Sequence, residues 1–207
     1  MQKGLAQMKH VLDLGTNKTV IVLLHGTGGD ARSLMGLAKQ LSPESTLLGI
    51  EGDVLENGMR RYFARYSDGS FDLESLHEAT IKLQETIQSL LEEHNLTDHK
   101  VALLGYSNGA NIAVNIFKEY ETRYDLALLL HPSSGRATVP FKAQTKLTAF
   151  ITSGDNDPFI SKEEFDVLED TFRQADIKVE VFRHQQGHQL TQAELYKTAE
   201  LLAKLEV

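Results

Sequence analysis

The chain has no cysteine among its 207 residues, so disulfide bonds, thiolate metal sites and a cysteine nucleophile are excluded. Basic residues are also scarce, with 21 Lys and Arg against 29 Asp and Glu. The resulting net charge of -8 disfavours a nucleic-acid partner, which would need a concentrated basic patch. No apolar run approaches the roughly 18 residues of a membrane span, and residues 1–14 show no secretory signal pattern. We therefore expect a cytoplasmic protein without a membrane span.

Motifs of several other functions are missing as well. The sequence contains neither G-x-x-x-x-G-K-[ST] nor G-x-G-x-x-G, so phosphate and dinucleotide loops are disfavoured. Histidines and carboxylates do not cluster at metal-ligand spacing. There are no repeats, low-complexity tracts or linkers. We therefore expect one domain over residues 1–207, with no cofactor and no metal.

Short apolar runs alternate along the chain with helical patterns. Strands are predicted at 8–14, 19–24, 46–50, 101–104, 126–130, 147–152 and 179–182. Helices are predicted at 31–41, 73–95, 110–117, 165–172 and 195–205, a loop at 51–69, and a loop or a short helix at 133–146. This alternation predicts an α/β fold with a mostly parallel central sheet and helices on both faces. Ligands bind such sheets at the carboxyl ends of the strands, so those loops should carry the chemistry.

The segment Gly105-Tyr106-Ser107-Asn108-Gly109 lies between a predicted strand and a predicted helix. Strand, G-x-S-x-G and helix form the context of a nucleophile elbow, in which a sharp turn exposes the serine hydroxyl. The alternative is an ordinary turn whose serine caps the helix. The rest of the chain favours the nucleophile.

Two later strand-end loops supply an acid and a histidine, in the chain order expected of a Ser-Asp-His triad. A serine hydroxyl needs an imidazole to accept its proton and a carboxylate to orient that imidazole. We predict Asp157 as the acid, since Asp155 suits the cap of its own turn. We predict His188 as the base, since His184 still follows the strand alternation and should lie on a sheet face.

The loop His25-Gly26-Thr27-Gly28-Gly29 follows the strand at 19–24. Acyl transfer places negative charge on the carbonyl oxygen, and backbone amides must stabilise it. We predict the amides of Thr27 and Asn108 as the oxyanion hole. His25 is expected to pack and hydrogen-bond within its loop.

These motifs resemble those of small α/β-hydrolases of the phospholipase/carboxylesterase (acyl-protein thioesterase-like) family. The resemblance extends over nearly the whole chain and is carried by residues 24–30, 105–111, 154–158 and 187–190. Within this family the chain is similar to bacterial carboxylesterases linked to hydroquinone and quinone stress. The resemblance implies a triad of Ser107, Asp157 and His188, a minimal lid and a possible homodimer. Asn108 stands where the family often has Gln or Met, which changes a side chain and not the donating amide.

The segment 56–63 is similar to an arginine-aromatic segment of that subgroup. It predicts substrate contacts at Met59, Arg60 and Phe63. The alternative is that Arg60, Arg61 and Arg65 pair with carboxylates of this acidic protein itself.

The sequence therefore predicts a serine hydrolase, a carboxylesterase that cleaves small carboxylic esters or thioesters through an acyl-enzyme on Ser107. The alternatives are a related phospholipase or thioesterase, a C–C hydrolase or perhydrolase with the same triad, and a non-catalytic ligand-binding protein on this scaffold.

Overall fold

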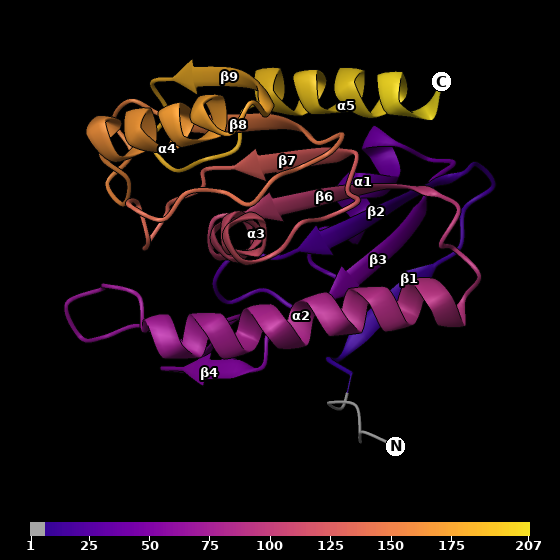
Figure 1. Ribbon diagram of the computed structural model, residues 1–207, viewed down its shortest axis with the longest axis horizontal. Helices are drawn as coiled ribbons and strands as arrows, with labels where there is room; N and C mark the ends of the chain where they lie inside the picture. The colour runs from indigo at the N-terminus through magenta and orange to yellow at the C-terminus, as the bar shows by residue number, and fades with distance from the viewer. Residues whose placement is uncertain (1–6) are drawn as a thin grey trace.

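The computed structural model describes residues 7–207 and contains a central sheet flanked by helices (Figure 1). The sheet strands are β1 (His10–Asp13), β2 (Thr19–Leu24), β3 (Thr46–Ile50), β6 (Lys100–Tyr106), β7 (Leu126–Leu130), β8 (Thr148–Gly154) and β9 (Lys178–His184). The helices are α1 (Met35–Leu41), α2 (Leu73–Glu93), α3 (Asn108–Glu119), α4 (Lys162–Gln174) and α5 (Gln192–Glu206).

The sheet has seven strands in the order β1-β3-β2-β6-β7-β8-β9. Only the edge strand β1 is antiparallel to its neighbour, and the other pairings are parallel. The inner strands β2, β3 and β7 are buried at every position, which explains their continuous apolar sequence. The predicted mostly parallel sheet is confirmed.

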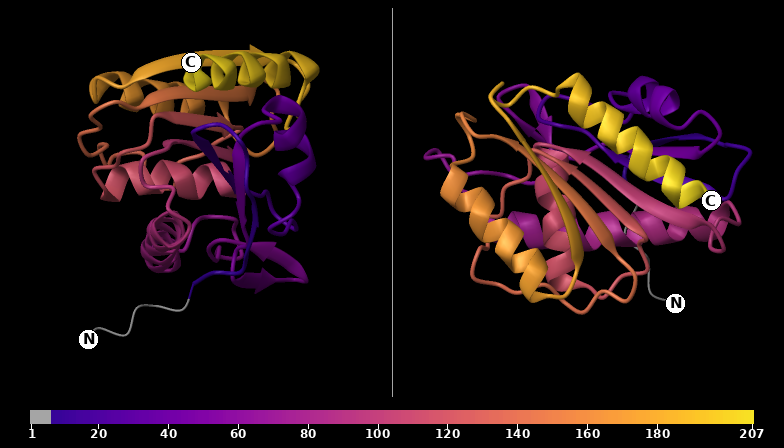
Figure 2. Two further views of the ribbon diagram at one scale, coloured as in Figure 1. Left: turned by 90° about the vertical axis from the view of Figure 1, so that its right-hand side faces the viewer. Right: turned by 90° about the horizontal axis from the view of Figure 1, so that it is seen from above.

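Helices cover both faces of the sheet, as predicted (Figure 2). Helices α1 and α5 pack on one face, where Ala38 and Leu202 lie among the buried apolar residues. Helices α2, α3 and α4 pack on the other, where Ile87, Phe117 and Phe172 are fully buried. The sheet therefore separates two apolar cores, and the strand ends carry the polar loops.

Two local predictions were wrong. Residues 51–69, predicted as a loop, contain a hairpin of β4 (Val54–Glu56) and β5 (Met59–Arg61). Helix α1 begins at Met35 instead of residue 31, because the Asp30 carboxylate accepts from the Arg32 amide and holds a turn there. Segment 133–146, predicted as a loop or a short helix, contains turns and no helix.

No helix within residues 7–207 has the length and apolar character needed to cross a bilayer.

Candidate active site

Ser107 lies in the sharp turn between β6 and α3, with φ 52° and ψ -115°. A non-glycine residue in this region is strained by about 1–3 kcal/mol, and such strain is typical of functional sites. The Ser107 side chain makes no capping hydrogen bond to α3. The alternative interpretation, a serine that caps the helix, is therefore wrong.

The two glycines of the motif are required by close packing. A Cβ on Gly105 would lie 2.8 Å from the Ala110 Cα, and one on Gly109 would lie 2.0 Å from the carbonyl oxygen of Leu24. Strand β2 and helix α3 can therefore meet beside Ser107 only if residue 109 has no side chain.

We expect Gly109→Ala to lower the free energy of unfolding by about 3 kcal/mol or more, because β2 would have to shift. Gly36→Ala is the matched control, since a Cβ on this helical glycine meets nothing within 4 Å. It should leave stability unchanged or raise it by up to about 1 kcal/mol. Urea unfolding of both variants measures the difference, and equal midpoints would contradict the packing argument.

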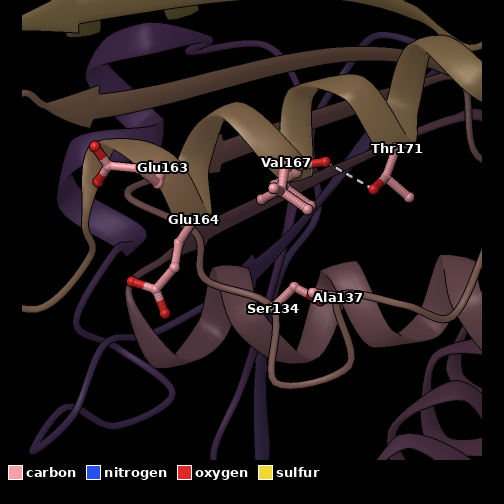
Figure 3. Close-up of a pocket in the computed structure, with 7 residues that line it drawn as sticks. Ser134, Ala137, Glu163, Glu164, Val167 and Thr171 are labelled. Carbon is pink, nitrogen blue, oxygen red and sulfur yellow. Dashed lines mark hydrogen bonds between the residues drawn. The ribbon is translucent and has the colours of Figure 1, made fainter.

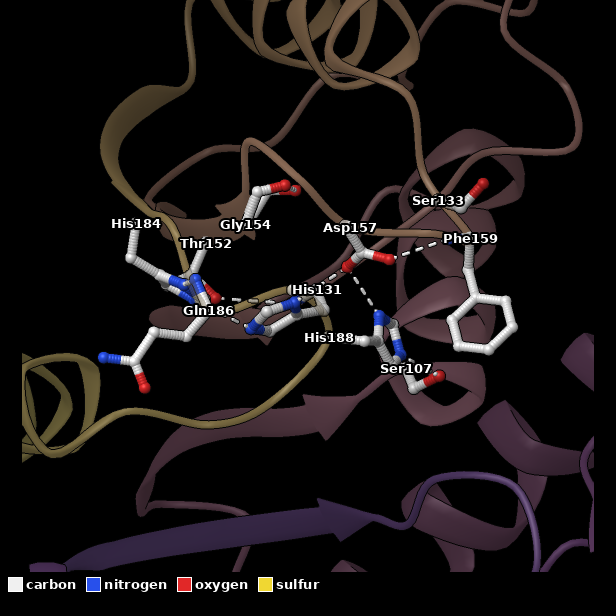
Figure 4. A network of polar contacts seen from close by, with 12 residues as sticks. Ser107, His131, Ser133, Thr152, Gly154, Asp157, Phe159, His184, Gln186 and His188 are labelled. Carbon is white, nitrogen blue, oxygen red and sulfur yellow. Dashed lines mark hydrogen bonds and ion pairs between the residues drawn. The ribbon is translucent and has the colours of Figure 1, made fainter.

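Ser107, His188 and Asp157 form a continuous hydrogen-bonded line (Figure 4). His188 Nδ1 lies 2.6 Å from Asp157 Oδ2 and must donate, because a carboxylate only accepts. His188 Nε2 lies 2.9 Å from Ser107 Oγ and is then free to accept from the hydroxyl. The three residues predicted as a triad thus lie together, with the imidazole in the tautomer that general-base chemistry requires.

Asp157 is held in place by its own turn. Its Oδ1 accepts from the Phe159 amide at 2.9 Å, which holds the turn at 157–159. Asp155 Oδ2 instead accepts from the Gln185 side chain at 2.7 Å. Burial alone would raise the pKa of Asp157, but hydrogen bonds from Phe159, His188 and His131 lower it below its usual value. Asp157 is therefore ionised at neutral pH.

The residue before Ser107 supports the histidine loop. The Tyr106 hydroxyl donates to the carbonyl oxygen of His188 at 2.6 Å. The Tyr106 ring also lies beside the His188 ring, with centroids 5.5 Å apart, and the Phe159 ring meets His188 edge-on at 5.0 Å. The imidazole of His188 is thus fixed from several sides.

The predicted oxyanion-hole residues Thr27 and Asn108 both line the cavity that contains Ser107. Within residues 7–207, neither backbone amide has a hydrogen-bond acceptor. The β4–β5 hairpin braces both residues, since Arg61 donates to Thr27 Oγ1 at 2.8 Å and the Tyr62 amide donates to Asn108 Oδ1 at 2.8 Å. The two amides are therefore free to donate to an oxygen of a bound ligand.

His25 packs within its loop, as predicted. Its ring is buried against Tyr62, Nε2 accepts from the Gly52 amide at 3.0 Å, and Nδ1 donates to the carbonyl oxygen of Gly26. Burial lowers the pKa of His25. His25 is thus a neutral structural residue.

A cavity of about 650 Å³ opens beside Ser107. Of the three residues predicted to contact substrate, only Met59 lines it. Phe63 is fully buried against Phe71, and Arg60 pairs with Glu51 outside the cavity, so the prediction for these two residues is corrected. The other lining residues that bear on specificity are Arg61, Arg65, Phe71, Phe159 and Ile160.

Arg61 and Arg65 share a single carboxylate, that of Glu56. Arg61 Nε lies 2.7 Å and Arg65 Nε 3.8 Å from Glu56 Oε2, and neither Nε is aligned for a hydrogen bond within the described residues. Desolvation, followed by repulsion from Arg65, lowers the pKa of Arg61. All three arginines therefore pair with the protein's own carboxylates, as the alternative expected, although Arg61 and Arg65 share one carboxylate.

Sequence reasoning missed three side chains that extend the polar network. His131, immediately after β7, is fully buried and faces Asp157 on one side and Glu194 of α5 on the other. His184, at the end of β9 as predicted, also contacts Glu194. The position of His131 at a strand end was the available signal. Its acidic partners are 26 and 63 residues away in the chain, so spacing could not reveal them.

A second cavity, of about 230 Å³, lies between helix α4 and the loop that follows β7 (Figure 3). Glu164 on its wall is already engaged in the capping box of α4 with Ser161. No imidazole that could activate a hydroxyl lines this cavity. The chemistry of the described residues is therefore concentrated around Ser107.

Solved structures with similar folds include the Bacillus cereus carboxylesterase, with a TM-score of 0.91 and 37% identity over 97% of this chain and 95% of the other. The structure of YahD with malic acid has a TM-score of 0.85 and 30% identity, over 96% of this chain and all of YahD. Maize acyl-protein thioesterase 2, at 17% identity, shares the fold, with a TM-score of 0.72 over 97% of this chain and all of the other. The resemblance to small α/β-hydrolases of the carboxylesterase group is confirmed.

Sequence comparison gives the same grouping. The chain is 38% identical over 193 residues to MhqD of Bacillus subtilis (strain 168), which covers 93% of this chain and 96% of MhqD. Residues 57–198 match the Dienelactone hydrolase family, and these comparisons together support hydrolase activity. The chain belongs to the dienelactone hydrolase family.

Proposed function

We propose that this chain is a carboxylesterase that hydrolyses small carboxylic esters or thioesters through an acyl-enzyme on Ser107. The observation that carries this proposal is the hydrogen-bonded line from the Ser107 hydroxyl through His188 to Asp157, at the edge of a cavity. An ionised Asp157 and a neutral His188 tautomer provide the proton acceptor that a serine nucleophile needs.

In the proposed mechanism, Ser107 Oγ attacks the carbonyl carbon while His188 Nε2 takes the hydroxyl proton. The carbonyl oxygen becomes an oxyanion, which the amides of Thr27 and Asn108 stabilise. His188 then returns the proton to the leaving alcohol or thiol as the bond to the acyl group breaks. Water enters, His188 takes its proton, and collapse of the second tetrahedral intermediate releases the acid and the Ser107 hydroxyl.

Covalent labelling tests this proposal against a ligand-binding protein on the same scaffold. A fluorophosphonate reacts only with an activated serine, so the wild-type chain should be labelled and Ser107→Ala should not. A panel of aryl, alkyl and thioester acyl donors then identifies the leaving group. Absence of labelling together with absence of turnover over the panel would favour the binding protein.

We further propose that the preferred esters carry a carboxylate. Arg61 and Arg65 line the cavity and have one Glu56 carboxylate between them, which leaves guanidinium capacity for an acidic group. The solved structure of YahD, a relative at 30% identity, contains malic acid, a dicarboxylic acid. Arg61 also holds Thr27, so Arg65 is the better residue to test.

We expect Arg65→Gln to reduce kcat/KM for an ester that bears a carboxylate by about 10-fold to 100-fold, the effect of losing a charged hydrogen bond. Neutral esters should be hydrolysed at nearly the wild-type rate. Arg60→Gln is the matched control, because it removes the same charge from a side chain that pairs with Glu51 outside the cavity. Steady-state kinetics on two esters that differ only in a carboxylate group test this prediction. Equal losses of kcat/KM for the two esters would contradict specificity for acidic substrates.

A further inference from the structure

A second imidazole lies behind Asp157, on the side away from Ser107 (Figure 4). His131 Nδ1 is 3.1 Å from Asp157 Oδ2, the same oxygen that receives the hydrogen bond from His188. His131 Nε2 is 3.1 Å from Glu194 Oε1. The backbone of His131 has φ 55°, a strained conformation for a residue other than glycine. The fold thus places this ring between two buried carboxylates.

The partners of His131 determine its protonation. Ionised carboxylates only accept hydrogen bonds, so both ring nitrogens must donate and His131 is an imidazolium. Burial alone would lower the pKa of His131, but the hydrogen bonds to Glu194 and Asp157 outweigh burial and raise it. The hydrogen bonds that Glu194 accepts overcome its own burial and lower the pKa of Glu194 to about 2. A buried positive charge therefore lies between two negative ones.

Glu194 is fixed by contacts that orient its carboxylate toward His131. Its Oε2 accepts from the Thr191 amide at 2.6 Å, in the capping box of α5, and lies 3.2 Å from His184 Nε2. His184 Nδ1 accepts from the Gln186 amide at 3.0 Å, so the His184 proton is on Nε2 and points at Glu194. The 3.3 Å contact between the Nε2 atoms of His131 and His184 therefore joins two donors that share one carboxylate.

The ligand atoms of His131, His184 and Glu194 lie within 4.8 Å of one another, a spacing that a metal ion also requires. A metal bound to His184 Nε2 would displace the proton there to Nδ1. That nitrogen already accepts the Gln186 amide. The hydrogen bonding therefore favours a proton-linked charge pair over a metal site.

Titratable groups face His131 from each element that packs against it. They are Tyr106 of β6, Asp157 of the β8–α4 loop, His184 of β9, His188 of the β9–α5 loop and Glu194 of α5. Burial, and then the charges of Asp157 and Glu194, raise the pKa of Tyr106, which stays neutral. The carboxylates of Asp157 and Glu194 are thus the negative charges that face His131.

We propose that His131 and Glu194 form a positioning pair that holds Asp157 ionised and aimed at His188, and that this pair sets the pH range over which the triad works. The inference rests on the proposed function of the triad. The His131 charge offsets part of the Asp157 charge, so Asp157 draws a proton onto His188 less strongly.

The test is the double variant His131→Gln/Glu194→Gln, which removes one positive and one negative charge and keeps hydrogen-bonding groups at both positions. Without the imidazolium, the full Asp157 charge acts on His188. We expect the acidic limb of the kcat/KM profile to move to higher pH by about one unit. The shift comes from loss of the His131 charge, whose ring centroid lies 5.0 Å from that of His188. Loss of the Glu194 charge offsets part of this effect. KM should change little, and kcat above the shifted limb should recover to near the wild-type value.

The control is His99→Gln/Asp98→Asn, which removes a histidine–carboxylate pair whose atoms lie 2.8 Å apart just before β6, at the end of this strand away from Ser107. Its pH profile should superimpose on that of the wild type. A double variant at 131 and 194 whose limb does not move, or whose kcat falls equally at every pH, would overturn the proposal, because a purely structural role predicts those results.

A second measurement does not depend on the stability of the variant. Nitrogen-15 spectra of the full wild-type chain should show protons on both ring nitrogens of His131 at neutral pH, and a neutral ring would overturn the charge pair. Fluorophosphonate labelling of the same sample reports on Ser107 separately. Failure of the proposed function would therefore appear as absent labelling, and failure of this inference as an unshifted profile or a neutral His131 in a chain that is labelled.

Discussion

Ser107→Ala is expected to lower kcat by about 10⁴-fold to 10⁶-fold, the range found when a triad nucleophile is removed. The methyl group of alanine cannot attack a carbonyl carbon, and no acyl-enzyme can form. The substitution keeps the Cβ and adds no strain to the turn at φ 52°. Hydrolysis of p-nitrophenyl acetate, followed by release of the phenolate, measures the loss.

Ser133→Ala provides the control for this change. Ser133 also lines the cavity, and its amide donates to Asn111 Oδ1 whatever its side chain. It should keep wild-type activity within a few fold. If Ser107→Ala hydrolysed the ester at nearly the wild-type rate, the nucleophile assignment would be wrong.

His188→Ala should cause a comparably large loss of kcat, because the Ser107 hydroxyl would lose the only base within hydrogen-bond distance in the described chain. Activity of the wild type should rise with pH on the acidic side, since a protonated imidazole cannot accept the serine proton. Measurement of kcat/KM for a neutral aryl ester across the pH range tests both statements.

His184→Ala is the comparison for the base. The His184 side chain contacts Glu194 and His131 and does not reach Ser107. It should retain most of the activity that His188→Ala loses. An inactive His184 variant beside an active His188 variant would move the base to His184.

The central sheet could be predicted because its strands are apolar and buried on both faces, as in β2 and β7. The β4–β5 hairpin could not, because its strands have three residues each and no apolar run. Because the hairpin was not predicted, the prediction of a substrate contact at Arg60 was wrong. Side chains alternate along a strand, so Met59 and Arg61 share the face that lines the cavity while Arg60 points away.

The positions of Ser107, Asp157 and His188 could be predicted because each follows a recognisable strand in a loop of suitable residues. Their catalytic roles remain predictions. The partners of His131 could not be predicted, since Glu194 reads in the sequence only as the acidic member of a helix capping box. Only the packing of α5 against the strand ends brings that carboxylate to the histidine.

The contact between the Tyr106 hydroxyl and the His188 carbonyl has a consequence for turnover. Tyr106 directly precedes the proposed nucleophile Ser107, and its hydrogen bond holds the loop that carries the proposed base His188. The positions of the two reacting groups are therefore linked. We therefore expect the reacting groups to be preassembled before substrate arrives, so that catalysis does not wait for a loop to close.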